Sequence, residues 1–256
     1  MSQPSGTYHP TSPYTVNLEP VYGLRPRAFP FYIVCDVSHS MWAERSDGPA
    51  PWDSLAPCVR KLLFELESSS PEVSEAAHVS IVAFHDQAEV ILPLTRPVNA
   101  INVPILPKGG QTNYADVFEK LAPIIEADCV RLERDHRRKM PVVFFVTDGN
   151  PYVGHEDQPA EVWLPMRDRL VDPARPFPAH VVAMGFGDVK EQTLCQVATE
   201  FHGNKLAYVA KVGQNPSTVV KEIVESICIS ISASVTGPDF VIQVPEGMRQ
   251  INCGAW

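Results

Sequence analysis

The sequence predicts an α/β protein with a doubly wound, Rossmann-like, mostly parallel six-stranded sheet, one antiparallel edge strand and helices on both faces. Short apolar runs alternate with segments whose apolar residues recur every three or four positions, the pattern of strands alternating with amphipathic helices. Only residues 85–88, with a turn at 85–87, separate the second and third apolar runs, and so short a connection joins antiparallel neighbours. With 256 residues, 45% of them hydrophobic, the chain can bury the core that this fold requires.

Six strands are expected along the chain. The first covers residues 31–35, a continuous apolar run that is too short for a buried helix. Continuous apolar runs are typical of strands that are covered on both faces, as in parallel sheets. The other five are expected at residues 78–84, 89–94, 141–147, 179–184 and 205–209.

Amphipathic helices are expected between these strands. A first apolar stripe runs from Leu55 to Leu66, and a second over residues 114–132 contains Pro123, where we expect a kink or a break. A shorter helix is expected over residues 159–170. Two more are expected, one around Leu194–Phe201 and a last one over Val219–Ile231.

The chain is expected to form one large domain over residues 30–232. Residues 1–29 are rich in proline and lack periodicity, so they are expected to be an extended N-terminal segment. Residues 233–256 depart from the alternating pattern and are expected to be a C-terminal tail, in which residues 240–244 could add one strand.

Composition excludes several classes of function. The net charge of −9, from 21 basic and 30 acidic residues, argues against nucleic-acid binding. The six cysteines form no CxxC pair and are expected to be buried thiols in a reducing compartment. The eight histidines show no HExxH-type spacing, which argues against zinc. No signal peptide or run of ~20 apolar residues is found, so we expect a cytoplasmic protein that does not bind membranes.

Oxygen-bearing side chains follow two of the predicted strands and precede one helix. Asp36, Ser38 and Ser40 come directly after the first strand, Thr112 precedes the helix at 114–132, and Asp148 follows the strand at 141–147. In open α/β sheets, ligands bind beyond the carboxyl ends of the strands. Carboxylate and hydroxyl oxygens suit Mg²⁺ or Mn²⁺ better than zinc or copper. Because hydroxyls are neutral ligands, a cation held here keeps its affinity for a further anionic oxygen.

Three motifs occur in order: DxSxS at residues 36–40, Gly-Gly-x-Thr at 109–112 and Thr-Asp-Gly at 147–149. Together they resemble the von Willebrand factor A (vWA) domain family, and the resemblance extends over about residues 30–232. In that family these motifs form the metal-ion-dependent adhesion site (MIDAS). One departure is His39, where many members carry glycine. We interpret His39 as a solvent-facing residue without a role in the site; the alternative is that it restricts the loop or makes the site sensitive to pH.

The resemblance implies a role for each matching residue. Ser38 and Ser40 resemble the direct hydroxyl ligands, and Thr112 the hydroxyl that coordinates directly or through water. Asp36 and Asp148 resemble the carboxylates that coordinate directly or through water. The expected cofactor is Mg²⁺, with Mn²⁺ or Ca²⁺ as alternatives.

Within the family, the sequence VCDVSHSM near the N-terminus is most similar to bacterial TerY-type proteins. These are vWA proteins linked with tellurium-resistance and stress-response gene sets, and they work beside phosphatase and kinase partners. The resemblance therefore implies a partner of that kind.

Three functions are compatible with these residues. The leading hypothesis is a non-enzymatic interaction module, in which an Asp or Glu of a protein partner completes the coordination of the metal. The second is a Mg²⁺-dependent phosphatase or hydrolase, for which His155 and Glu156 are the local candidates for a general base and no phosphate-binding loop occurs. The third is a metal that only holds three loops together.

Overall fold

The computed structural model describes residues 25–46, 48–100 and 105–254. The Pro-rich segment expected at residues 1–29 therefore lies almost wholly outside the described residues. Its last residues belong to the first strand, which begins at Arg27.

One large mixed sheet forms the centre of the molecule, with the strand order β12-β11-β8-β5-β1-β2-β3. The inner pairs are parallel, whereas β2–β3 and β11–β12 are antiparallel. The doubly wound α/β fold is thus confirmed, and a second antiparallel edge is added by the tail. The strands are β1 (Arg27–Asp36), β2 (Ala77–Phe84), β3 (Ala88–Thr95), β5 (Val142–Thr147), β8 (His180–Gly185), β11 (Ala207–Ala210) and β12 (Met248–Gln250), with the short β4 (Arg137–Arg138) beside the start of β1.

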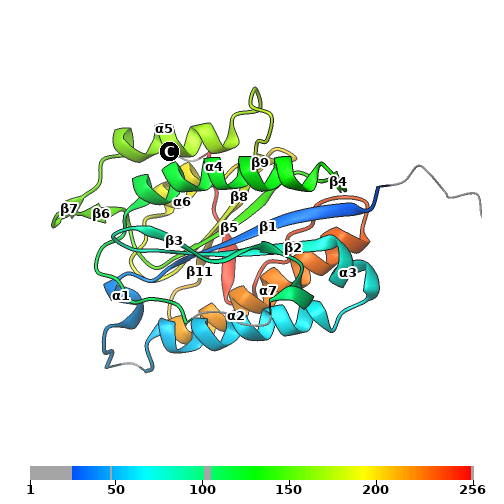
Figure 1. Cartoon of the computed structure of the whole chain (residues 1–256). Coiled ribbons are helices and arrows are strands. Elements are labelled where there is room, and N and C mark those ends of the chain that lie inside the picture. Colours follow the sequence, from blue (N-terminus) through cyan, green and yellow to red (C-terminus); the bar gives the residue numbers. More distant parts are fainter. Residues whose placement is uncertain (1–24, 47, 101–104, 255–256) are drawn as a thin grey trace, which may run out of the picture.

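Two layers of helices cover the sheet (Figure 1). The layer that contains α2, α3 and α7 packs on one face, and the layer that contains α4, α5 and α6 packs on the other. The helices are α1 (His39–Trp42), α2 (Pro51–Glu67), α3 (Pro71–Ala76), α4 (Tyr114–Leu132), α5 (Ala160–Val171), α6 (Glu191–Val197) and α7 (Pro216–Thr236), with a 3₁₀ turn η1 at Pro97–Asn99.

Strand β1 shows why the central runs are apolar throughout. Phe31 points to the core beneath α2 and α7, while Tyr32 points to the core beneath α4 and α5. Successive side chains of a strand alternate between its faces, so a strand covered on both sides needs apolar residues at every position. Ile33 is paired with Ile81 of β2 on one side and Phe144 of β5 on the other.

Two local expectations differ from the structure. Helix α4 runs without a break through Pro123, which lies on its exposed side, because Leu121 and Ile125 anchor the neighbouring turns in the core. The strand of the tail lies at Met248–Gln250 rather than at residues 240–244. Two short hairpins, β6 (Tyr152–Val153) with β7 (Glu156–Asp157) and β9 (Glu200–Phe201) with β10 (Asn204–Lys205), were not expected.

The expectation that all six cysteines are thiols is wrong for two of them. Cys195 and Cys253 form a disulfide with a Cα–Cα distance of 5.6 Å, whereas Cys35, Cys58, Cys129 and Cys228 are free. The two cysteines are 58 residues apart, so no local sequence motif predicts the disulfide. Only the fold brings the tail to α6. Among the helices of the described residues, none is both long and apolar enough to cross a membrane.

Candidate metal centre

The predicted ligands meet at the carboxyl end of the sheet. Asp36 is the last residue of β1, and Asp148 directly follows β5. These strands are parallel neighbours, so their carboxyl ends coincide. Figure 1 shows α1 and the β6–β7 hairpin at this same end of the molecule.

Four of the five predicted residues form one chain of polar contacts. The backbone N–H of Ser38 donates to Asp36 Oδ1 at 2.9 Å. The hydroxyl oxygens of Ser38 and Ser40 are 3.3 Å apart. The Ser40 hydroxyl then donates to Asp148 Oδ1 at 2.7 Å.

Thr112 lies beside this chain without a hydrogen bond from its hydroxyl to the other four residues in the described part of the protein. Its backbone forms a bridge with Tyr152, with N–H to O distances of 3.0 and 2.9 Å. Its hydroxyl faces Gly149, where an added Cβ would lie 3.8 Å from Thr112 Oγ1. Thr112 is therefore held next to the loop of Asp148.

The loop that carries Thr112 depends on glycine. A Cβ added to Gly109 would lie only 2.1 Å from the Cβ of His85, so no other residue fits there without moving the backbone. The Gly109 N–H donates to Val37 O at 2.9 Å, and the Gly110 N–H donates to Asp86 Oδ2 at 2.8 Å. Gly109 thus joins the Thr112 loop to the loop that follows β1, and Gly110 joins it to the turn between β2 and β3.

Sequence reasoning missed two residues that support the carboxylates. Thr147 donates its hydroxyl to Asp36 Oδ2 at 2.6 Å, and Tyr114 donates its hydroxyl to the carbonyl of Gly149 at 3.1 Å. Thr147 is the first residue of the Thr-Asp-Gly motif, so the motif itself could have indicated it. Tyr114 appeared only as a member of the apolar stripe of its helix.

Burial dominates the electrostatics of the two carboxyl groups. Asp36 is fully buried and Asp148 is 5% exposed. Desolvation raises the pKa of both, and the negative charge of Asp148 raises the pKa of Asp36 further. Hydroxyl and backbone N–H groups donate hydrogen bonds to these carboxylates, and the positive charge of Arg45 lowers the pKa of Asp148 only in part. Two buried negative charges this close are neutralised most directly by a divalent cation.

Residues 31–150 match the model of the von Willebrand factor type A domain. The fold of this chain is that of a vWA domain. Comparison with curated proteins gives no match.

Solved structures with the vWA fold agree with this result. The vWA protein from Catenulispora acidiphila is 14% identical with a TM-score of 0.55, covering 80% of this chain and 43% of that one. Proximal thread matrix protein 1 from the mussel byssus, with a zinc-occupied MIDAS motif, is 15% identical with a TM-score of 0.53, covering 82% and 49%. The pilus adhesin SpaC from Lactobacillus rhamnosus GG in its open conformation is 12% identical with a TM-score of 0.55, covering 80% and 30%. The chain spans less than half the length of each, and identities this low show a shared fold.

The donor set of this cluster fits a hard divalent cation. Two carboxylates and three hydroxyls supply only oxygen, the donor type that Mg²⁺, Mn²⁺ and Ca²⁺ prefer. Within the described ranges, no group of three or more His, Cys, Asp or Glu side chains could hold a metal ion, so the hydroxyls would have to be part of any site here. Ser40 is exposed whereas Asp36 is buried, which leaves the cluster open to solvent on the Ser40 side.

The candidates for a catalytic base lie apart from this cluster. His155 and Glu156 are exposed residues of the β6–β7 hairpin. Within the described ranges, neither of the two predicted bases is hydrogen-bonded to the carboxylates of the cluster.

Proposed function

We propose that this vWA domain is a non-enzymatic, metal-dependent protein-interaction module. Asp36, Ser38, Ser40, Thr112 and Asp148 hold Mg²⁺, with Mn²⁺ or Ca²⁺ as alternatives, and an Asp or Glu of a protein partner completes its coordination. The observation that carries the proposal is the chain of contacts from Asp36 to Asp148, which gathers oxygen donors at one exposed edge.

The depth of each ligand supports binding from one side. Asp36 lies at the bottom, surrounded by Ser38 and Thr147. Ser40 forms the exposed side of the cluster. A cation held between them would be reachable only from the Ser40 side, where a partner carboxylate could replace water. Mg²⁺ keeps part of its water shell in protein sites, so such an exchangeable position is expected.

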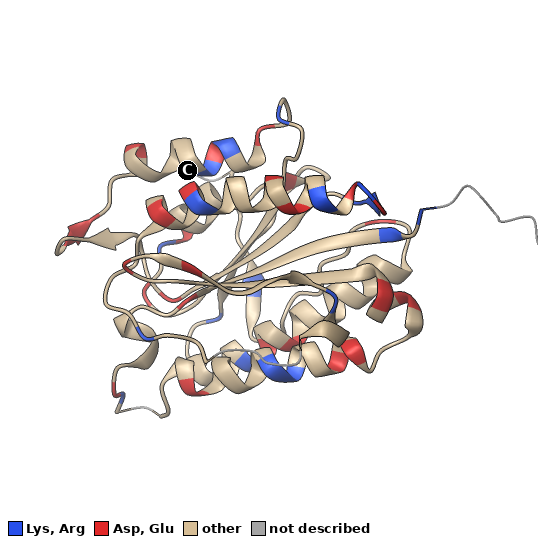
Figure 2. Cartoon of the chain, viewed as in Figure 1, with Lys and Arg blue, Asp and Glu red and all other residues tan. Residues whose placement is uncertain are grey.

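The rim of the site differs in charge from one side to the other. Beside the Ser40 loop, Lys108 Nζ lies 4.4 Å from the ring centroid of Trp52 and 5.6 Å from that of Trp42. On another side, the β6–β7 hairpin carries Glu156 and Asp157, and Figure 2 shows its acidic colouring. An acidic partner segment is therefore favoured over Lys108 and repelled by β7. Tryptophan is also enriched at protein interfaces.

The cellular context is the finer part of the proposal. The similarity of VCDVSHSM to TerY-type proteins supports a role in a bacterial tellurium-resistance or stress-response system, with a phosphatase or kinase of the same gene set as partner. The proposed partner is a protein and not a nucleic acid or a membrane. A cytoplasmic location requires the Cys195–Cys253 disulfide to persist or re-form against the thiols of that compartment.

The test measures metal binding and partner capture separately. Mg²⁺ and Mn²⁺ are titrated into the metal-free protein by calorimetry, and candidate phosphatases and kinases of the gene set are then tested for capture with Mg²⁺ and with EDTA. We expect the partner to be captured with Mg²⁺ and released by EDTA. In Asp36→Asn and Ser40→Ala we expect both metal binding and partner capture to be lost. Asp168→Asn changes a carboxylate whose side chain is 65% exposed and serves as the matched control.

Two other results would contradict the proposal. Capture that is unchanged by EDTA and by Asp36→Asn would show that the metal only holds the loops. Hydrolysis of a generic phosphoester that is lost in Asp148→Ala would show an enzyme.

A further inference from the structure

The last part of the chain forms a strap, here defined as residues 238–254, which follows α7 and ends beside α6. Its first half lies along α7, which covers one face of the sheet. Met248 belongs to the core beneath α7, whereas Ile251 belongs to the core on the other face. The strap therefore passes around the β11 edge of the sheet from one layer to the other.

Hydrogen bonds from a row of buried serines hold the first half of the strap on α7. The serines are four residues apart and so lie on one side of the helix. The Val241 N–H donates to Ser234 Oγ and the Gln243 N–H donates to Ser230 Oγ, both at 2.9 Å. The Ser226 hydroxyl donates to the carbonyl of Gln243.

The second half is attached over a short distance. The Gly247 N–H donates to Glu222 Oε2 at 2.7 Å. Strand β12 pairs with β11 at three positions only, and the Ile251 N–H donates to the carbonyl of Ala207 at 2.9 Å. Met248 and Ile251 are its fully buried apolar anchors. Lys211 also donates from its backbone N–H to the carbonyl of Gly247 and from Nζ to that of Glu246, and Arg249 pairs with Glu191. These are mostly polar contacts at the edge of the sheet, where proteins open locally.

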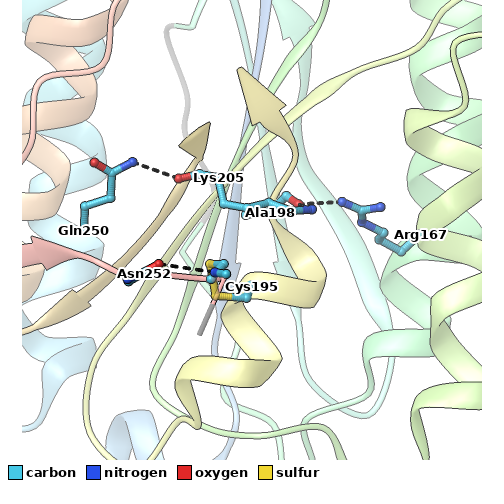
Figure 3. Close-up of a disulfide and its surroundings, with 8 residues drawn as sticks. Arg167, Cys195, Ala198, Lys205, Gln250 and Asn252 are labelled. Carbon is cyan, nitrogen blue, oxygen red and sulfur yellow. Dashed lines mark hydrogen bonds between the residues drawn. A yellow bond between two sulfur atoms is a disulfide. The ribbon is translucent and has the colours of Figure 1, made fainter. Parts of the chain in front are cut away.

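The disulfide fastens this segment to a rigid element. Cys195 lies on α6, and the carbonyls at the end of that helix accept hydrogen bonds from two cationic side chains (Figure 3). Arg167 donates to the carbonyls of Val197 and Ala198 at 3.0 and 2.6 Å, and Lys205 donates to that of Ala198 at 3.1 Å. Cys253, by contrast, lies between exposed neighbours.

The bond is also accessible from solvent. Cys253 lines a hollow of about 520 Å³ together with Lys205, Gln250 and Asn252. Cys195 is buried, at 8% exposure. A small thiol can therefore approach Cys253 along the hollow, whereas Cys195 is buried and does not line it.

We propose that Cys195–Cys253 is a thiol-exchange site, which a dithiol reductant opens in the folded protein to release the strap from β11 and α7. A thiolate of the reductant attacks Cys253 Sγ; the S–S bond breaks, and its electron pair leaves with Cys195 Sγ, which takes up a proton. The second thiol of the reductant then attacks its own sulfur in the mixed disulfide. Cys253 is released as a thiol, and the reductant becomes a cyclic disulfide. The proposal does not depend on the metal site.

Hydrogen exchange on the full chain tests this, comparing the oxidised protein with protein reduced by dithiothreitol and with Cys253→Ser. We expect the strap amides of Val241, Gln243, Gly247 and Ile251 to exchange at least about tenfold faster after reduction, while β1 and β5 keep their protection. Cys58→Ser alters a free, half-buried thiol and is expected to behave like the wild type. If Cys253→Ser fails to fold, the comparison of the oxidised wild type with the wild type reduced by dithiothreitol tests the proposal.

Three results would overturn the proposal. The bond could resist the dithiol until the protein is unfolded. The strap amides could keep their protection after complete reduction, which would show that its own contacts hold it. Protection could also be lost in β1 and β5 together with the strap. This would show that the disulfide stabilises the whole fold and does not only hold the strap in place.

Discussion

The hydroxyl of Ser40 donates a 2.7 Å hydrogen bond to Oδ1 of Asp148, 108 residues further along the chain. This contact links the loop after β1 to the loop after β5 and completes the row of oxygens that begins at Asp36. A cation bound to both residues would take over the role of the hydroxyl proton. The state of these two loops is therefore expected to depend on metal, which leads to the first prediction.

Asp36→Asn is expected to stabilise the metal-free protein and to remove its response to metal. In the absence of a cation, the substitution removes one of two buried negative charges that repel each other, which we expect to raise the free energy of unfolding by about 1 kcal/mol. The wild type gains stability when Mg²⁺ is added, and the variant does not. Chemical unfolding with EDTA and with Mg²⁺ measures both effects. A variant that is less stable than the wild type in EDTA would contradict the repulsion argument.

Gly109→Ala is expected to displace the loop that carries Thr112. The added Cβ would meet the Cβ of His85 at 2.1 Å, and relieving this clash costs about 1–3 kcal/mol. Metal affinity should fall with it. Gly110→Ala is the matched control, since its Cβ would lie 3.4 Å from the Asp86 carboxylate, an ordinary contact. Thermal unfolding and metal titration of both variants decide this, and equal behaviour of the pair would count against the argument.

Ser230→Ala is expected to weaken the strap. The Ser230 hydroxyl is fully buried, accepts from the Gln243 N–H at 2.9 Å and donates to the carbonyl of Ser226 at 2.7 Å. Its loss leaves the Gln243 N–H without this acceptor, while the Ser226 carbonyl keeps its helical hydrogen bond, and we expect a cost of about 1–2 kcal/mol. Thr236→Ala removes an exposed hydroxyl at the end of the same helix and should change stability by less than about 0.5 kcal/mol. Urea unfolding compares the free energies of unfolding of the two variants. If Ser230→Ala is as stable as the wild type, solvent satisfies the Gln243 N–H.

The contribution of His78 to stability is expected to be lost as the pH is lowered below the ordinary range of histidine. Burial lowers the pKa of His78, and the nearby His136, Arg96 and Arg131 lower it further. The folded protein therefore binds this proton less well than the unfolded chain, so the stabilisation is present above pH ~6.5 and is lost as the pH falls through the lowered folded pKa.

His78→Phe should flatten this dependence between pH 7.5 and 5, as followed by urea unfolding in EDTA. His155→Asn is the control, because His155 is exposed and has a positive φ of 70° that asparagine tolerates. If the slope for His78→Phe equals that of the wild type, another group controls the acid sensitivity.

Much of the fold was predictable because the relevant signals are local. Apolar runs such as Phe31–Cys35 and the stripe from Leu55 to Leu66 record which faces are covered, and the three-residue turn at 85–87 requires an antiparallel pair. Of the kink or break expected at Pro123, the break does not occur, because tertiary packing of the neighbouring turns outweighs one missing backbone donor. The additional strand considered at residues 240–244 lies instead at Met248–Gln250, because three residues of β12 give too short a pattern to locate.

By itself, the sequence determined the fold class and the order of the three motifs, since strand periodicity and motif spacing are properties of neighbouring residues. Only the tertiary structure decided that Ser40 meets Asp148, that Thr147 supports Asp36, and that Cys253 reaches Cys195. These pairs are separated by 58 to 111 residues, and nothing local to either partner encodes the contact. The parallel alignment of β1 with β5 and the passage of the tail around β11 bring them together.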